Sequence, residues 1–410
     1  MQSIYFDHAA TTSLAPECLE AMMPYFKERY GNASATYRLG REAAEGIDQA
    51  REEVAELIGA ASGEICFTAG GTEANNLAII GAAMAGRNRG RHIVTSAIEH
   101  SSVLEACRWL ERQGFRMTYL PVDELGRVEP QAILDAIEAD TILISLMHAN
   151  NEIGTIQPVE AAGRIARERG ILFHTDAVQT VGRIPVDVDD IRCDLLSAAS
   201  HKMYGPKGAG CLYVRRETKL EPVLMGGSQE RGLRAGTENI AGIVGFGRAA
   251  VLAGKEMTAD HWQLTRLRDH LMNGVLDAVG GVVLNGHRFE RLPGNANFSF
   301  REVDGPTMLR RLDEHGFAVS SGSACHAASP KPSHVLKALG HDDDLARATL
   351  RVTLGRHNTV AEIDRLLDVL PEVIAECRER WPAQQRERSL TETSECPCEQ
   401  DTAGSIRKES

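Results

Sequence analysis

The sequence lacks the features of a membrane protein, a secreted protein or a nucleic-acid-binding protein. Its longest apolar runs, such as residues 141–147, fall far short of the roughly 20 residues that span a bilayer. The first residues, MQSIYFDHAATT, contain neither a basic segment nor a long apolar stretch, so we do not expect a signal peptide. Lysine and arginine (45) are outnumbered by aspartate and glutamate (57), and the formal net charge is −12. We therefore expect neither a membrane nor nucleic acid among its partners.

Two nucleotide-binding motifs and a disulfide framework are also missing. The glycine pair in TAGGTEANN (68–76) fits neither G-x-G-x-x-G nor a Walker loop, which disfavours a Rossmann dinucleotide site. The nine cysteines are odd in number and form no dense framework, which favours a reducing, cytoplasmic location. Cys396 and Cys398 stand one residue apart, a poor spacing for zinc; they could relay sulfur or hold a metal, but an inert tail is favoured. We predict no metal site.

The first half of the chain does contain short apolar runs that alternate with helical patterns. Such runs lie at residues 64–70, 91–97, 141–150, 171–177 and 194–200. This alternation is typical of an α/β fold with a mostly parallel sheet covered on both faces. Because ligands of such sheets bind at the carboxyl ends of the strands, we expect functional residues where these runs end.

The pattern changes near residue 256, where a long helical segment precedes shorter strands and a final helix. We predict a large domain of residues 15–255 and a smaller α+β domain made of residues 1–14 and 256–382. After Pro382 the chain becomes polar and poor in apolar residues. Residues 383–410 are therefore predicted to form a disordered tail.

Lys202 follows the apolar run 194–200 and precedes the glycine-rich turn YGPKG. A lysine amine that is fixed in place and has a lowered pKa can form a Schiff base, although a surface lysine would fit the local pattern as well. Asp176 ends the preceding apolar run, where a carboxylate is costly unless it is paired. It could keep a pyridoxal ring nitrogen protonated, or it could serve as a helix cap or in a structural ion pair. Both side chains could flank one ligand.

Several further residues at the ends of these runs could serve the same ligand. In TAGGTEANN, backbone N–H groups at a helix start could bind phosphate together with the Thr72 hydroxyl, or Thr72 could simply cap the helix. His100 could stack on a planar cofactor or be structural. Asn151 and Gln179 are amides that could bind a ring oxygen or stabilise turns.

Cys325 and Arg351 lie in the second half of the chain. Cys325 stands among small residues and prolines in SSGSACHAASPKPS, so we expect an exposed loop whose thiolate could be a nucleophile, or a chance exposed thiol. Arg351 lies inside the apolar run ATLRVTLG, where a buried guanidinium needs an anionic partner. That partner could be the carboxylate of an amino-acid substrate or a structural one.

Eight fragments of the sequence, taken in order, resemble a known family. They are FDHAATT, GGTEANN, EHSS, NNEIGTIQP, HTDAVQTVG, SHKMYGPKG, RAGTEN and SSGSAC. Together they resemble the pyridoxal-phosphate-dependent cysteine desulfurases of the NifS/IscS type, within the class-V aminotransferases, over about residues 4–380. The resemblance implies fold type I, a mostly parallel sheet of seven-stranded type with a smaller α+β domain, and a homodimer.

The resemblance also implies a role for each candidate residue. Lys202 would bind pyridoxal 5'-phosphate covalently and move the substrate proton, and Cys325 would accept sulfur from L-cysteine as a persulfide and pass it to an acceptor such as an iron–sulfur scaffold. Arg351 and Asn151 would bind the substrate, and His100 would stack on the ring and take part in catalysis. The cofactor would be held by Gly71, Thr72, Glu73, His100, Asn151, Asp176, Gln179, Ser200, His201, Lys202 and, from the other subunit, Thr237.

The sequence departs from the family pattern at Ala199, often serine, at the alanine and tyrosine of GNASATYRLG, and at His326 beside the cysteine. The long loop around Cys325 is that of the NifS/IscS branch. Two alternatives remain open: a selenocysteine lyase or another pyridoxal-phosphate lyase or aminotransferase, and a catalytically silent sulfur carrier or scaffold. The colour of the purified protein and sulfur release by a Cys325 variant would separate them.

Overall fold

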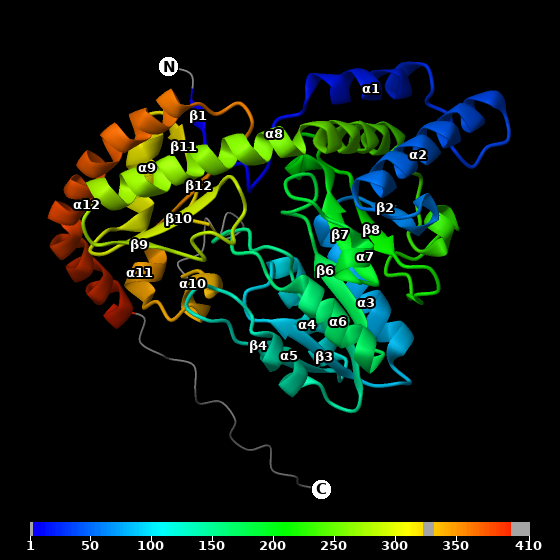
Figure 1. Ribbon diagram of the computed structural model, residues 1–410, viewed down its shortest axis with the longest axis horizontal. Helices are drawn as coiled ribbons and strands as arrows, with labels where there is room; N and C mark the ends of the chain where they lie inside the picture. Colours follow the sequence, from blue (N-terminus) through cyan, green and yellow to red (C-terminus); the bar gives the residue numbers. More distant parts are fainter. Residues whose placement is uncertain (1–2, 323–331, 395–410) are drawn as a thin grey trace, which may run out of the picture.

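The computed structural model describes residues 3–322 and 332–394 (Figure 1). Its centre is a seven-stranded sheet in the order β2-β8-β7-β6-β5-β3-β4. The strands pair in parallel except β8, which is antiparallel to both of its neighbours. The strands are β2 (Ile65–Thr68), β3 (His92–Ser96), β4 (Arg116–Leu120), β5 (Thr141–Ser145), β6 (Leu172–Asp176), β7 (Leu195–Ala199) and β8 (Gly210–Val214).

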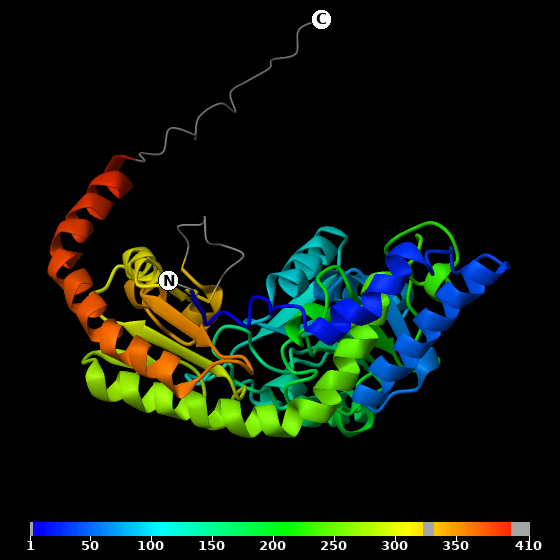
Figure 2. The same cartoon turned by 90° about the horizontal axis from the view of Figure 1, so that it is seen from above.

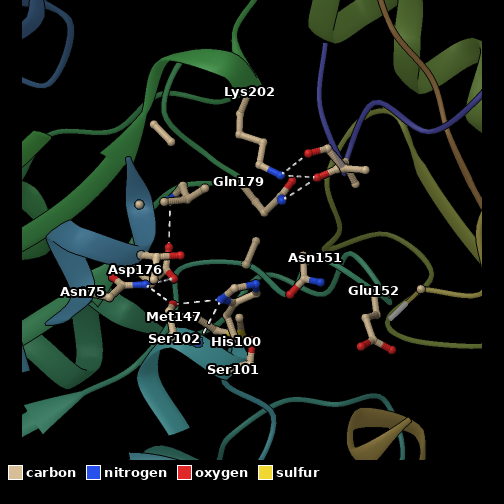
Figure 3. Close-up of a pocket in the computed structure, with 18 of the residues that line it drawn as sticks. Asn75, His100, Ser101, Ser102, Met147, Asn151, Glu152, Asp176, Gln179 and Lys202 are labelled. Carbon is tan, nitrogen blue, oxygen red and sulfur yellow. Dashed lines mark hydrogen bonds between the residues drawn. The ribbon is translucent and has the colours of Figure 1, made fainter. Parts of the chain in front are cut away.

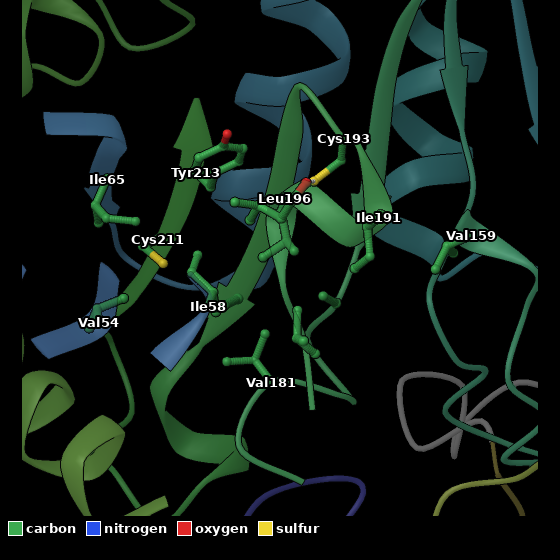
Figure 4. Packing of buried hydrophobic residues seen from close by; sticks show 14 of the residues in the cluster. Val54, Ile58, Ile65, Val159, Val181, Ile191, Cys193, Leu196, Cys211 and Tyr213 are labelled. Carbon is green, nitrogen blue, oxygen red and sulfur yellow. Dashed lines mark hydrogen bonds between the residues drawn. The ribbon is translucent and has the colours of Figure 1, made fainter. Parts of the chain in front are cut away.

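Helices cover both faces of this sheet, as the two-sided apolar strands predicted. Alternate residues of one strand enter different clusters: Cys66 of β2 packs with α3 and α4, whereas Ile65 and Phe67 pack with α2, α6 and α8. Figure 4 shows part of the second cluster, where Val54 and Ile58 meet Ile65 and Cys211. The helices are α1 (Pro16–Lys27), α2 (Arg38–Leu57), α3 (Gly71–Gly86), α4 (Ser101–Arg112), α5 (Pro130–Ala136), α6 (Val159–Arg169), α7 (Val188–Ile191) and α8 (Ile240–Ala278), with short 3₁₀ turns η1 (Ser62–Glu64), η2 (Ser200–Lys202) and η3 (Gln229–Gly232).

A smaller α+β part is built on a three-stranded antiparallel sheet, β12-β10-β9, and a two-stranded parallel sheet, β1-β11. Its core contains phenylalanines and leucines from the strands, α9, α12 and the last turns of α8. The elements are β1 (Ile4–Tyr5), β9 (Val282–Leu284), β10 (Asn295–Phe300), α9 (Gly305–Glu314), β11 (Phe317–Ala318), α10 (His334–Ala338), α11 (Asp343–Arg347), β12 (Thr349–Thr353) and α12 (Val360–Ser394).

Helix α8 connects the two parts. Its 39 residues form one continuous helix along one side of the molecule (Figure 2). Phe246 and Ala249 enter the core against the large sheet, whereas Leu271 and Val275 enter the core of the smaller part. The change of pattern near residue 256 therefore lies within a helix that supports both cores.

The fold class predicted from the sequence is confirmed, because the structure is α/β with a mostly parallel seven-stranded sheet and a smaller α+β part. One detail differs: α12 continues to Ser394, twelve residues into the segment predicted to be disordered. This stretch is rich in glutamine, glutamate and arginine, which favour helix, and it contains no glycine. The domain limits remain predictions. Among the residues that the structure describes, no helix is both long and apolar enough to cross a membrane.

Candidate active site

A cavity of about 290 Å³ lies at the carboxyl ends of β3, β5, β6 and β7, beside the N-terminal segment 7–12 (Figure 3). Most of the candidate residues line it, because nearly all of them lie at the end of a strand or the start of the next helix; Arg351 comes instead from within β12. Those that line it are Gly71, Thr72, His100, Asn151, Asp176, Gln179, His201, Lys202 and Arg351. The arrangement follows the rule that parallel strands gather their ligand-binding residues at one edge.

The Lys202 side chain reaches the N-terminal segment. Its Nζ donates hydrogen bonds to the carbonyl oxygens of Ala9, at 2.5 Å, and Ala10, at 2.7 Å. Burial, together with the positive charges of Arg183 and Arg351, lowers the pKa of Lys202 to about 7. The amine can therefore lose its proton near neutral pH, as a nucleophile or a base must.

Asp176, the last residue of β6, is connected to His100 by two residues that sequence reasoning missed. Asn75 Nδ2 donates to Asp176 Oδ2 at 2.7 Å and to Ser102 Oγ at 2.8 Å. Ser102 Oγ lies 2.8 Å from His100 Nδ1, and the Ser102 backbone N–H donates to the same nitrogen at 3.1 Å. The backbone N–H of Val178 also donates to Asp176 Oδ1. Figure 3 shows this chain of hydrogen bonds.

This network fixes the chemical form of His100. Because Nδ1 accepts the backbone N–H, the proton of the neutral ring is carried on Nε2. Burial lowers the pKa of His100, which favours that neutral ring. The signal was present in the sequence: Asn75 stands three residues after Thr72, and Ser102 two residues after His100, so both lie in or near a first helical turn that faces the cavity.

Arg351 lies on β12 with a side chain only 2% exposed. Its Nη1 donates to the carbonyl oxygens of Asn151 (2.9 Å) and Gly322 (2.8 Å), and its Nη2 pairs with Asp7 Oδ1 at 2.7 Å. The Nε atom is buried without a partner in the described part of the chain. The anion that a buried arginine requires is thus supplied by Asp7, which sequence reasoning did not single out.

The remaining candidates lie at the edge of the cavity or outside it. Ser200 is fully buried, and its Oγ has no partner in the described residues. The Glu73 carboxylate accepts from the Ala69 backbone N–H at 3.0 Å and from Arg234 Nε at 2.8 Å. Thr237 is exposed and does not line the cavity of its own chain. Cys325 lies outside the described residues.

A second hollow of about 890 Å³ adjoins the first near the start of α3 and shares Ala10, Gly71, Thr72 and His201 with it. Gly70 precedes α3 with φ of 155°, a conformation that favours glycine. The first N–H groups of α3 have no acceptor within the helix, so this end can bind an anion. Among the described residues, no cluster of three or more His, Cys, Asp or Glu side chains could hold a metal ion.

These residues suit pyridoxal 5'-phosphate. The cavity brings together a lysine amine that can lose its proton, a buried carboxylate and an open helix N-terminus. Two buried polar atoms close by, Gln179 Oε1 and Ser200 Oγ, have no partner within the described residues. Buried polar atoms normally have partners, so a polar ligand in this place is expected.

Known proteins agree with this geometry. The family described as aminotransferase class-V matches residues 4–366. The chain is 51% identical to cysteine desulfurase IscS of Dictyoglomus turgidum, covering 94% of this chain and 98% of that protein, and 48% identical to cysteine desulfurase IscS of Methanosarcina thermophila, covering 94% and 95%. Among solved structures, a NifS-like protein superposes with a TM-score of 0.86 at 37% identity, covering 91% of this chain and all of that one. A structure described as SspA in complex with cysteine gives a TM-score of 0.76 at 38% identity, covering 87% and 99%. The chain belongs to the class-V aminotransferase family and, within it, to the cysteine desulfurases of the NifS/IscS type.

Proposed function

We propose that this protein is a pyridoxal 5'-phosphate-dependent cysteine desulfurase, which converts L-cysteine to L-alanine and transfers the sulfur through Cys325. The observation that carries the proposal is the meeting, in one cavity, of the Lys202 amine, the Asp176 carboxylate, the start of α3 and Arg351. Each serves a different part of the chemistry: covalent binding, ring protonation, phosphate binding and substrate binding.

The cofactor would be held by groups that the structure already orients. The first N–H groups of α3 and the Thr72 hydroxyl would bind the phosphate, and Asp176 would bind the ring nitrogen. Pyridoxal 5'-phosphate, when bound, withdraws electrons from the substrate α- and β-carbons. Asp176 supports this because Asn75 and the Val178 N–H hold its carboxylate in place.

Lys202 and His100 supply the proton-transfer groups. The Lys202 amine, with a pKa of about 7, can act as a base that takes a proton from the substrate α-carbon. His100 presents its Nε2–H, because Nδ1 is occupied by Ser102. Arg351 and Asn151 would bind the α-carboxylate and orient the substrate for this transfer.

The sulfur transfer would be a displacement at the sulfur of the substrate. The thiolate of Cys325 attacks that sulfur, so that an S–S bond forms as the substrate C–S bond breaks. The bonding electron pair leaves with the β-carbon, which is reduced and protonated to the methyl group of alanine. The transferred sulfur is oxidised to the sulfane level and remains as a persulfide on Cys325, from which an acceptor such as an iron–sulfur scaffold would take it.

We further propose that two copies of the chain form a homodimer in the cytoplasm and that Thr237 completes the phosphate site of the partner copy. Thr237 is exposed, and the hollow near α3 is large enough to admit another chain segment. Exposed apolar side chains, such as Phe26 on α1 and Met225, offer surface for such an interface.

The test begins with the visible spectrum of the purified full chain. A coloured protein whose absorbance is lost in Lys202→Ala supports the cofactor, whereas a colourless protein that cannot be loaded with pyridoxal 5'-phosphate would indicate a silent carrier. Release of alanine and sulfide from L-cysteine under reducing conditions is then measured in Cys325→Ser. Loss of release by at least a hundredfold is expected from the loss of a nucleophile. Unchanged release would favour a selenocysteine lyase or another lyase. The buried Cys107→Ser is the matched control, because Cys107 lies in a core away from the cavity.

A further inference from the structure

We propose that Arg183 is a positioning residue for Lys202: it holds the backbone of that residue and keeps an unpaired positive charge beside the amine, so that the amine sheds its proton. The inference rests on the proposed function, because it concerns the lysine that would bind the cofactor. Arg183 stands in the turn after β6, four residues beyond Gln179, and was not among the candidates from the sequence.

The hydrogen bonds of Arg183 join two segments that meet at the Lys202 amine. Its Nε and Nη2 donate to the Lys202 carbonyl oxygen at 3.3 and 3.1 Å, and Nη2 also donates to the His8 carbonyl oxygen at 2.6 Å. The next carbonyls along the N-terminal segment, those of Ala9 and Ala10, accept from the Lys202 Nζ. One guanidinium therefore holds both the backbone of Lys202 and the N-terminal segment whose carbonyl oxygens bind the Lys202 amine.

The charge of Arg183 is not neutralised by a direct partner. Within the residues that the structure describes, it forms no ion pair with a carboxylate. It lines a separate small cavity of about 30 Å³ with Lys202, His8 and Asp260, but Asp260 pairs with Arg356 at 3.0 Å. Burial lowers the pKa of the Arg183 guanidinium itself, as expected for a cation without an anion beside it.

Among the charged groups around the Lys202 amine, Arg183 is the cation whose charge is not cancelled by a paired carboxylate. Asp176 from β6 and Asp7 from the N-terminal segment favour the charged amine, whereas Arg351 from β12 and Arg183 oppose it. Arg351 is paired directly with Asp7, at 2.7 Å, so these two charges largely cancel at a distance. The neighbouring His201 is neutral near pH 7, because burial and Lys202 lower its pKa to about 4. Arg183 is left as the cation that offsets Asp176.

The experiment is a pH titration of the visible absorbance of the cofactor-loaded protein, since the band reports protonation at the Lys202 nitrogen. Arg183→Gln retains hydrogen-bonding capacity but removes the charge, and its midpoint is expected to rise by roughly one pH unit. Arg183→Lys retains the charge, so its midpoint should stay near that of the wild type. The exposed Arg169→Gln, which removes one positive charge far from the cavity, should leave the midpoint unchanged and is the matched control.

A second measurement covers variants that do not retain the cofactor. The full chain, freed of cofactor, is treated with a lysine-directed acylating reagent over a range of pH, and labelling at Lys202 is followed by peptide mass spectrometry. Arg183→Gln should shift the labelling profile to higher pH, again without a shift in Arg183→Lys. Equal profiles for wild type and Arg183→Gln, or equal shifts in both variants, would overturn the proposal. A wild-type chain that shows no cofactor band would instead count against the proposed function, and the labelling profile would still test Arg183.

Discussion

The lowered pKa of Lys202 predicts how the stability of the cofactor-free protein depends on pH. The folded protein binds the lysine proton with a pKa of about 7, whereas an unfolded lysine keeps its ordinary value near 10.5. Between these two values the unfolded chain binds more protons than the folded one. The free energy of unfolding therefore rises with pH through this window, and the charged amine destabilises the fold below it.

Integrating the proton difference from about pH 6.5 to about pH 9.5 gives a gain of about 3 kcal/mol for the wild type. Lys202→Met removes the titrating group and keeps an unbranched side chain of similar length. The free energy of unfolding of this variant should lack that gain, so that the wild type gains about 3 kcal/mol relative to the variant across the window. The buried Glu99, whose pKa burial raises to about 8, titrates in the same range, but it contributes equally to both proteins.

The assay is urea unfolding of the cofactor-free full chain at several pH values, with wild type and Lys202→Met compared at each one. Lys207→Met is the matched control, because Lys207 is exposed and stands in the same turn. Its unfolding free energy should run parallel to that of the wild type. Parallel curves for wild type and Lys202→Met would refute the reasoning, since they would mean that the amine keeps an ordinary pKa in this cavity.

Two further predictions concern buried polar contacts. Asn75→Ala removes one hydrogen bond to a carboxylate and one to a hydroxyl. We therefore expect the free energy of unfolding to fall by about 2–4 kcal/mol and the cofactor to be released faster on dialysis. Asn76→Ala, at a partly exposed position, is the control. Glu230→Ala leaves the largely buried Arg51 without its partner at 2.7 Å, so urea unfolding should show a loss of about 3–5 kcal/mol. Glu42→Ala, in an exposed ion pair, should have little effect.

The sequence was sufficient to predict the sheet and most of the cavity because both follow from a periodic pattern. Apolar runs that end in Asp176 or precede Lys202 identify parallel strands, and parallel strands gather their ends at one edge. Two strands of the seven-stranded sheet were not identified. β4 is half-exposed and begins at Arg116, so its apolar signal is weak. β8 directly follows the glycine-rich turn and runs antiparallel, which the alternation of strands and helices does not predict.

The continuous helix α8 was also not predicted before residue 256, because its first half is rich in glycine, which lowers helix propensity. The structure gives the reason for two of these glycines. A Cβ atom on Gly247 would lie 2.6 Å from the Ala50 backbone, and one on Gly245 would lie 2.6 Å from Met22 Sδ. These glycines allow α8 to approach α2 and α1 closely, a long-range requirement that no local pattern reveals.

The contacts of Arg351 bear on the two roles that the sequence left open for this residue, a structural ion pair and a substrate site. A guanidinium has five N–H donors. In this structure three of them are used, two on Nη1 by the carbonyls of Asn151 and Gly322 and one on Nη2 by Asp7. Nε–H and the second hydrogen of Nη2 remain. The ion pair with Asp7 therefore leaves donors of Arg351 unused, so this structural role does not by itself contradict the proposed role of Arg351 in binding a substrate carboxylate.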